Sequence, residues 1–157
     1  MRFIISAGSS ISADYLEKAL SEISCTSKIT VHNMSNKYCN QSQQMSINRL
    51  CFNSAIALSS DLEPYALFWE LRQIEQKLGR IRSYSNAPRT IDLDVIISFP
   101  FSYCAHNFFV PHRELYQRNF FVFCAIEVLH LVGWPVPFLL YQARSKLPAK
   151  AWIACKN

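Results

Sequence analysis

An α+β fold is predicted by three features of this sequence. Its 157 residues suit a single domain. Half of them are hydrophobic and only 17% are charged, so the chain can bury a core. Strand-like runs and segments of helical periodicity follow one another in the order β-α-β-β-α-β. That order is typical of a ferredoxin-like sandwich, in which an antiparallel sheet is covered by two helices on one face.

The first half of the chain predicts a strand, a helix and two more strands. Residues 2–7 form a β-branched run that ends at Gly8. Residues 9–24 place apolar side chains at the i, i+3, i+4, i+7 spacing of a helix face. Residues 27–38 and 49–58 are the next strand candidates, and the polar stretch CNQSQQMSIN between them is expected to be a loop.

The second half centres on one helix and one strand. The helix is expected over residues 63–80, because Pro64 stands near its start and Gly79 at its end. Residues 89–99 alternate as a strand does, because Ile91, Leu93, Val95 and Ile97 would point to one face and Asp92 and Asp94 to the other. Beyond this strand we expect an irregular stretch, the short run 107–112, a helix from about Asn119 to His130, a turn and a final helix.

Cysteine spacing and hydropathy exclude several classes of protein. The six cysteines form no CxxC pair, which argues against a zinc knuckle or a thioredoxin-type redox motif. The N-terminal apolar run is too short for a signal peptide. The apolar segment 119–141 is interrupted by Glu127, His130 and two prolines, so we expect a buried helix and a turn there rather than a membrane span. A cytoplasmic protein without membrane contact is expected.

The charge distribution points to an anionic partner. Sixteen basic residues against eleven acidic ones give a formal charge of +5. Five of the basic residues fall between Arg72 and Arg89. After Glu127 the chain contains no acid, and the basic tail from about residue 142 can be a solvated face. We expect one domain over residues 1–157 that ends in this tail.

Two acids in the predicted strand indicate a metal site. Asp92 and Asp94 are two residues apart, so their carboxylates share one face of the strand at a distance of about 7 Å. A divalent cation between them would relieve their repulsion, and oxygen ligands favour Mg²⁺ with phosphate as a co-ligand. Guanidinium groups match phosphate oxygens and stay charged. Three arginines stand close by in the sequence and suggest a Mg-nucleotide site: Arg80, Arg82 and Arg89.

Other interpretations of the same residues remain open at this point. An Asp-x-Asp pair on an exposed strand can be a solvated edge, and an arginine beside it a plain ion pair. A ferredoxin-like sheet with phenylalanine and arginine side chains could also bind nucleic acid. Against this, the strand runs lack the aromatic pattern of RNA-binding sheets, and paired acids repel a phosphate backbone. We therefore expect no nucleic acid partner.

Four blocks of the sequence resemble one enzyme family. FNSAIAL, IEQKLGRIR, APRTIDLDVII and FVPHRELYQRNFF are similar, in order and spacing, to segments of the 6-hydroxymethyl-7,8-dihydropterin pyrophosphokinases of folate biosynthesis. The resemblance covers the chain from Gly8 to about Glu127. It implies transfer of pyrophosphate from ATP to the hydroxymethyl group of the pterin, with release of AMP and with two Mg²⁺ ions. We expect the protein to act as a monomer.

The same resemblance implies a role for each candidate site residue. Asp92 and Asp94 resemble the two metal carboxylates, and Asp92 also belongs to the expected pterin site. Arg80 and Arg89 resemble the arginines that bind ATP and neutralise the transferring group, so these four residues are the expected catalytic set. Further ATP contacts are implied at Glu75, Arg82, His112 and Arg118. Further pterin contacts are implied at Gly8, Asn53 and Phe120. Asn53 would form hydrogen bonds with the polar edge of the pterin, and Phe120 would stack on its ring.

The sequence departs from the family on the pterin side. The stretch 39–51 lacks the prolines and glycine that usually shape this loop, and Cys51 stands where Tyr or Phe is common. Tyr84 is a candidate substitute for the missing aromatic ring. We therefore expect a working enzyme with a looser pterin pocket. The alternative is a divergent homologue that binds Mg-ATP with weak or no pterin turnover.

Overall fold

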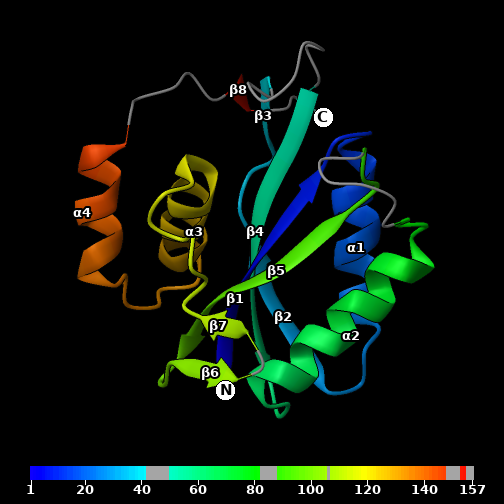
Figure 1. Cartoon of the computed structure of the whole chain (residues 1–157), viewed down its shortest axis with the longest axis horizontal. Helices are drawn as coiled ribbons and strands as arrows, with labels where there is room; N and C mark the ends of the chain where they lie inside the picture. Colours follow the sequence, from blue (N-terminus) through cyan, green and yellow to red (C-terminus); the bar gives the residue numbers. More distant parts are fainter. Residues whose placement is uncertain (42–49, 82–87, 106, 148–152, 155–157) are drawn as a thin grey trace.

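The computed structural model describes residues 1–41, 50–81, 88–105, 107–147 and 153–154 (Figure 1). In this part of the chain helices are interspersed with groups of strands. The elements are β1 (Arg2–Ser9), α1 (Asp14–Ser24), β2 (Ile29–Met34), β3 (Tyr38–Gln41), β4 (Leu50–Ser60), α2 (Pro64–Lys77), β5 (Asp92–Phe99), β6 (Tyr103–Ala105), β7 (Phe108–Val110), α3 (Asn119–Leu131), α4 (Phe138–Lys146) and β8 (Ile153–Ala154).

The main sheet confirms the predicted fold class. β1 lies between β4 and β5 and pairs antiparallel with both. β2 and β3 both pair antiparallel with β4, and β8 pairs with β3. The order β1-α1-β2-β4-α2-β5 is the predicted β-α-β-β-α-β arrangement. The loop expected from Cys39 begins later than predicted, because residues 39–41 belong to β3 and pair with β4. β6 and β7 form a separate two-stranded ribbon.

Helices lie on both sides of this sheet. α1 and α2 cover one face, and α3 and α4 lie on the other side (Figure 1). The sequence predicted the first pair on one face and a buried helix at α3, but it did not place that helix. Phe3, Ile4 and Ile5 of β1 are all 0% exposed. Phe3 and Ile5 pack in the core under α1 and α2, whereas Ile4 packs in the core under α3, so β1 is buried on both faces.

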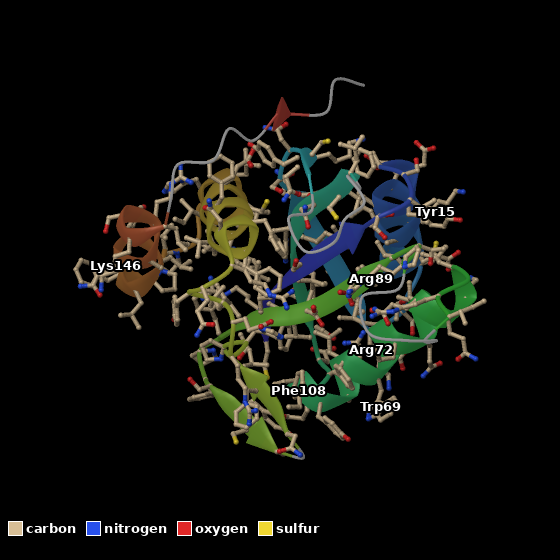
Figure 2. All side chains as sticks on the ribbon, turned by 45° about the horizontal axis from the view of Figure 1, so that its top comes forward. Tyr15, Trp69, Arg72, Arg89, Phe108 and Lys146 are labelled. Atoms are coloured by element: carbon tan, nitrogen blue, oxygen red, sulfur yellow. The ribbon has the colours of Figure 1, made fainter. Side chains whose placement is uncertain are left out.

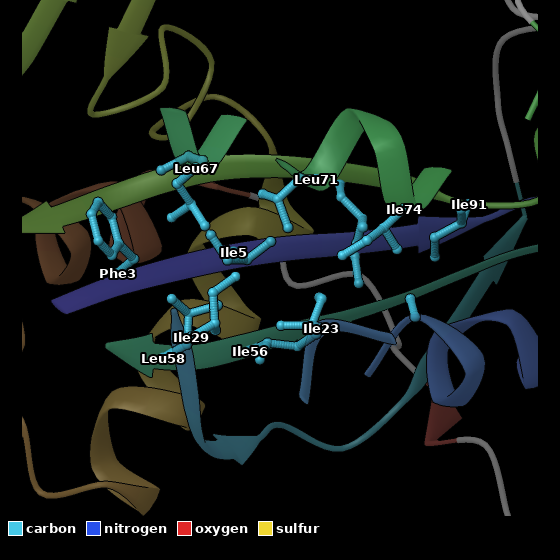
Figure 3. Packing of buried hydrophobic residues seen from close by; sticks show 14 of the residues in the cluster. Phe3, Ile5, Ile23, Ile29, Ile56, Leu58, Leu67, Leu71, Ile74 and Ile91 are labelled. Atoms are coloured by element: carbon cyan, nitrogen blue, oxygen red, sulfur yellow. The ribbon is translucent and has the colours of Figure 1, made fainter. Parts of the chain in front are cut away.

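The core beneath α2 holds this helix against the sheet. Leu67, Leu71 and Ile74 form an apolar stripe along α2, and they pack with Phe3 and Ile5 of β1 (Figure 3). Burial of a side chain of this size contributes about 1.5–3 kcal/mol to stability. The stripe therefore fixes α2, and with it the polar side chains that α2 presents toward β5.

The ends of α2 follow the predicted proline and glycine signals. Pro64 lies in the first turn of α2, where backbone N–H groups have no partner within the helix, so the lack of an N–H in proline costs no hydrogen bond. Gly79 follows the helix with φ +79°, a left-handed conformation that glycine adopts without a steric penalty. After this turn the backbone N–H of Arg80 donates a hydrogen bond of 3.0 Å to the carbonyl oxygen of Glu75. The glycine thus brings Arg80 back beside the last turns of the helix.

α3 is the buried helix predicted from about Asn119 to His130. Val122 and Val128 are both 0% exposed and belong to the core on this side of the sheet. The helix has 13 residues, fewer than the roughly 20 that a membrane span needs. No helix in the described part of the chain is long and apolar enough to cross a membrane.

Candidate active site

The strand register brings three predicted site residues into one row across the sheet. Gly8 of β1 pairs with Asn53 of β4 on one side and with Asp92 of β5 on the other. A Cβ atom at Gly8 would lie 3.4 Å from Asn53 Oδ1. Gly8 is part of the strand rather than of a turn, and its missing side chain leaves room beside Asn53.

Asp92 and Asp94 show the alternation that the sequence predicted for β5. Ile91, Leu93 and Val95 are 0%, 0% and 1% exposed. Ile97, which was predicted on the same face, packs in the core on the other side of the sheet, because the pairing of β5 with β1 has a bulge after Val95. The side chains of Asp92 and Asp94 are 17% and 20% exposed and share one side of the strand. Within the described chain β5 is an edge strand, so the backbone groups on its outer side need partners other than a neighbouring strand.

Glu75 of α2 supplies such a partner. Its Oε1 accepts a hydrogen bond of 2.7 Å from the backbone N–H of Leu93. The same carboxylate accepts hydrogen bonds from Arg72 Nη1 at 2.6 and 2.8 Å and from Arg80 Nη1 at 2.5 Å. Glu75 is only 1% exposed, and a carboxylate tolerates such burial when it is paired and hydrogen-bonded. Glu75 therefore joins α2 to β5 and positions two arginines.

Asp92 lies between the arginines that the sequence assigned to phosphate. Its Oδ1 accepts a hydrogen bond from Arg80 Nη1, and its Oδ2 accepts one from Arg89 Nη1. Arg72 Nη1 is 3.8 Å from Oδ1. Burial alone would raise the pKa of Asp92, but the positive charges of Arg89 and Arg80 outweigh burial and hold this pKa below its ordinary value. Asp92 is therefore a stable anion.

Asp94 is less well compensated than Asp92. Its Oδ1 accepts a hydrogen bond of 3.0 Å from Arg72 Nη2. Burial raises the pKa of Asp94, and the neighbouring charge of Asp92 raises it further. An added cation would favour the charged form of this carboxylate.

The donor set of the two aspartates fits Mg²⁺. Both offer carboxylate oxygens, and Mg²⁺ typically takes one or two carboxylates and completes its shell with water and phosphate oxygens. In the described ranges no group of three or more His, Cys, Asp or Glu residues could hold a metal ion by itself.

Three acids and three arginines form one cluster whose formal charges cancel. Figure 2 shows Arg72 on α2 and Arg89 near the start of β5. The side chain of Arg89 is 36% exposed and that of Arg80 is 10% exposed, so an incoming anion reaches Arg89 more easily. Phosphate binding by these arginines requires them to share or exchange their acid partners. We call this set the acid–arginine cluster, and it comprises Arg72, Glu75, Arg80, Arg89, Asp92 and Asp94.

Three further predicted site residues, His112, Arg118 and Phe120, come from the chain around the start of α3. His112 lies close enough to Asp94 to oppose the rise in the pKa of that carboxylate. The guanidinium of Arg118 faces the ring of Phe120 at 5.9 Å and the ring of Phe121 at 5.3 Å. Phe120 is half-buried and stands edge-on to Phe121 at 4.6 Å. The structure thus brings His112 toward the cluster and places Arg118 and Phe120 together.

Asn53 is oriented by a neighbour that the sequence did not single out. Asn53 is 5% exposed, and its side-chain amide nitrogen donates a hydrogen bond of 3.1 Å to Asn40 Oδ1. Asn40 lies opposite Cys51 in the pairing of β3 with β4. Cys51, predicted to replace an aromatic residue, is half-buried at this place.

Several sequence-based predictions concern residues outside the described ranges. Arg82, expected to bind ATP, and Tyr84, the candidate aromatic substitute, both lie there. So do most of the divergent loop 39–51 and much of the basic tail after Lys146.

Arg72 belongs to the cluster although the sequence assigned it no site role. It precedes Glu75 by three residues in α2, so the two side chains share one face of the helix. This spacing was available in the sequence. Its meaning depends on how α2 docks beside β5, which helical periodicity does not reveal.

Comparison with known proteins supplies a family for this arrangement. The family described as 7,8-dihydro-6-hydroxymethylpterin-pyrophosphokinase (HPPK) matches residues 4–130. The 2-amino-4-hydroxy-6-hydroxymethyldihydropteridine pyrophosphokinase of Bacillus subtilis is 28% identical over 118 residues, which are 75% of this chain and 71% of the relative. The bifunctional protein FolKE of Lactococcus lactis subsp. cremoris is 31% identical over 116 residues, 73% of this chain and 33% of the relative.

Folic acid synthesis protein FOL1 of Dictyostelium discoideum is 33% identical over 69 residues, 44% of this chain and 10% of that protein. The chain therefore spans most of one relative and a minor part of the longer ones. The family match covers every residue of the acid–arginine cluster and runs from β1 through nearly all of α3. By this match, this chain belongs to the HPPK family.

Proposed function

We propose that this chain transfers pyrophosphate from ATP to the hydroxymethyl group of 6-hydroxymethyl-7,8-dihydropterin, as a step of folate synthesis. A bond forms between the hydroxymethyl oxygen and the β-phosphorus of ATP. The O–H bond of the hydroxymethyl group and the bond from the β-phosphorus to the oxygen that bridges to the α-phosphate break, so AMP leaves and the proton is released to solvent. The observation that carries this proposal is that the acid–arginine cluster lies within the stretch 4–130 matched by the HPPK family.

In this proposal Asp92 and Asp94 would hold Mg²⁺ together with the phosphates of ATP, and two ions are expected. When bound, Mg²⁺ would stabilise negative charge on the phosphate oxygens. Among the described residues Asp94 has one arginine within ion-pair distance, whereas Asp92 has three. Asp94 therefore has the larger unused acceptor capacity for a cation.

Arg80 and Arg89 bind the transferring phosphates. A guanidinium can donate two parallel hydrogen bonds to a phosphate, and it remains charged throughout. Arg89, the more exposed of the two, can move from Asp92 to the nucleotide, while Glu75 holds Arg80 in place. We expect Arg82, His112 and Arg118 to make further ATP contacts.

The pterin binds on the row that Gly8, Asn53 and Asp92 form across the sheet. Asn53 donates its side-chain N–H to Asn40, which leaves its Oδ1 on the side of Gly8 to accept a hydrogen bond from the amino-substituted edge of the pterin. Phe120 covers the ring from the start of α3. Cys51 offers less area for stacking than an aromatic residue, which supports a looser pterin site.

The test is incubation of the purified protein with ATP, Mg²⁺ and the hydroxymethylpterin, followed by measurement of AMP. Formation of AMP that depends on the pterin is the expected result. ATP binding without AMP formation would favour the second candidate, a divergent homologue with weak or no turnover of the pterin. The presence of Cys51 in place of an aromatic residue supports this second candidate. Tight, salt-sensitive RNA binding without any nucleotide effect would contradict both.

We further propose that residues 1–157 act as one domain and as a monomer, without nucleic acid. The continuous sheet from β5 to β8 supports the single domain. Size-exclusion chromatography with light scattering checks the monomer.

A further inference from the structure

Arg72 makes contacts that join the three acids of the cluster. Its Nη1 donates hydrogen bonds to both carboxylate oxygens of Glu75, at 2.6 and 2.8 Å. Its Nη2 donates to Asp94 Oδ1 at 3.0 Å, and its Nη1 lies 3.8 Å from Asp92 Oδ1. One guanidinium therefore lies within ion-pair distance of all three carboxylates.

The surroundings of Arg72 favour this position for its charge. Its side chain is 16% exposed, so water screens the charge only weakly. The guanidinium carbon lies 4.6 Å from the centre of the Phe68 ring, a cation–π contact that supports it from α2. Its Nε is buried and has no hydrogen-bond partner among the described residues. The attraction of the acids offsets this unsatisfied donor.

Arg72 does for the aspartates what a metal ion would do. Asp92 and Asp94 carry like charges on one side of β5, and a cation near both relieves their repulsion. A divalent ion bound by the same two carboxylates would lie only a few Å from the guanidinium. The two positive centres would repel each other strongly, because little water separates them.

We infer that Arg72 is a built-in counterion of the Asp92–Asp94 pair, which weakens binding of a free divalent cation and makes cation binding depend on the nucleotide. This inference rests on the proposed role of the two aspartates as metal ligands. A triphosphate would give Arg72 and its neighbouring arginines new anionic partners, and the aspartates would then be released for the cation. The cluster thus discriminates between a free metal ion and a metal–nucleotide complex.

Binding of Mn²⁺ to the protein without nucleotide tests this inference. The loss of the free Mn²⁺ signal in electron paramagnetic resonance gives the dissociation constant. Arg72→Met removes the charge and keeps an apolar stem over Phe68, and it is expected to bind Mn²⁺ at least about tenfold more tightly than the wild type. Arg72→Lys keeps the positive charge and is expected to bind Mn²⁺ as weakly as the wild type.

Lys77→Met is the matched control. It removes one positive charge from the same helix, but Lys77 pairs with Glu22 of α1 and its side chain is 66% exposed. Its Mn²⁺ affinity is expected to equal that of the wild type. Circular dichroism establishes that each variant is folded, and Arg72→Gln replaces Arg72→Met if the latter is not.

A non-hydrolysable ATP analogue provides the second arm. In its presence the difference between Arg72→Met and the wild type is expected to shrink to within about threefold, because the nucleotide occupies the arginines. Tight Mn²⁺ binding by the wild type alone, or no gain in Arg72→Met, would overturn the inference. If adding Asp94→Asn to Arg72→Met does not change the Mn²⁺ affinity, the metal site itself is wrongly assigned. If the wild type forms no AMP with the pterin but the Mn²⁺ results are as expected, the proposed function fails and this inference stands.

Discussion

Replacement of Glu75 by glutamine should destabilise the whole protein. Glu75 is 1% exposed and accepts hydrogen bonds from two arginines and from the backbone of β5. Glutamine has nearly the same shape, and its carbonyl oxygen can still accept from the N–H of Leu93. Its NH₂ group would meet the donors of Arg72 or Arg80, and the buried negative charge that both arginines contact at 2.5–2.8 Å would be lost.

The expected loss in the free energy of unfolding follows from the burial of Glu75 and the arginines that it contacts. Removal of one partner from a buried ion pair costs about 3–5 kcal/mol, because the remaining charge is left uncompensated. Arg72 and Arg80 keep Asp94 and Asp92 as partners, so we expect the lower end, about 3 kcal/mol. This is a large share of the roughly 5–15 kcal/mol that keeps a typical domain folded.

Urea unfolding followed by circular dichroism measures the free energy of unfolding of Glu75→Gln and of a control. The control is Glu22→Gln, which removes the same charge from the Lys77–Glu22 pair, with side chains 66% and 28% exposed. We expect the control to change the free energy of unfolding by no more than about 1 kcal/mol. If Glu75→Gln also falls within this limit, Glu75 does not hold the cluster together as described.

Three further changes test other parts of the site and fold. Leu71→Ala should lower the free energy of unfolding by about 2–5 kcal/mol in urea, because Leu71 is 0% exposed under α2; a loss below about 1 kcal/mol would contradict this packing. Gly8→Val should raise the KM for the pterin without changing the KM for ATP, because its side chain would meet Asn53 Oδ1; equal effects on both substrates would argue against a pterin site here. Arg89→Lys should lower kcat/KM for ATP by at least about tenfold, because lysine cannot form two parallel hydrogen bonds to phosphate. Wild-type efficiency in this variant would exclude a bidentate contact.

Much of the fold follows from local patterns. The proline and glycine at the ends of α2 and the alternation in the first half of β5 are properties of neighbouring residues, and both predictions are confirmed. The bulge that moves Ile97 to the other face depends on the pairing of β5 with β1, so the alternation did not reveal it. The position of α3 likewise does not follow from a local pattern. The run Phe3–Ile4–Ile5 is apolar at successive positions, which is typical of a strand buried on both faces, but it does not say which later helix covers the second face.

The candidate site was predictable only in part for the same reason. Asp92, Asp94 and the arginines close to them in sequence were identified from spacing and from resemblance. The bridge from Arg72 to Asp94 depends on tertiary docking of α2 beside β5, over 22 residues of chain. The hydrogen bonds of Arg80 and Arg89 to Asp92 also became visible only in the structure, because sequence spacing does not show which acid each arginine contacts.

The most direct test of the proposed chemistry compares the wild type with Asp94→Ala. Both proteins are given ATP, Mg²⁺ and the hydroxymethylpterin, AMP is measured over time, and circular dichroism verifies that the variant is folded. If the two aspartates of β5 hold the metal and its phosphates, the rate of pterin-dependent AMP release falls by at least about a hundredfold in the folded variant. A folded Asp94→Ala protein that releases AMP at the wild-type rate would contradict the account.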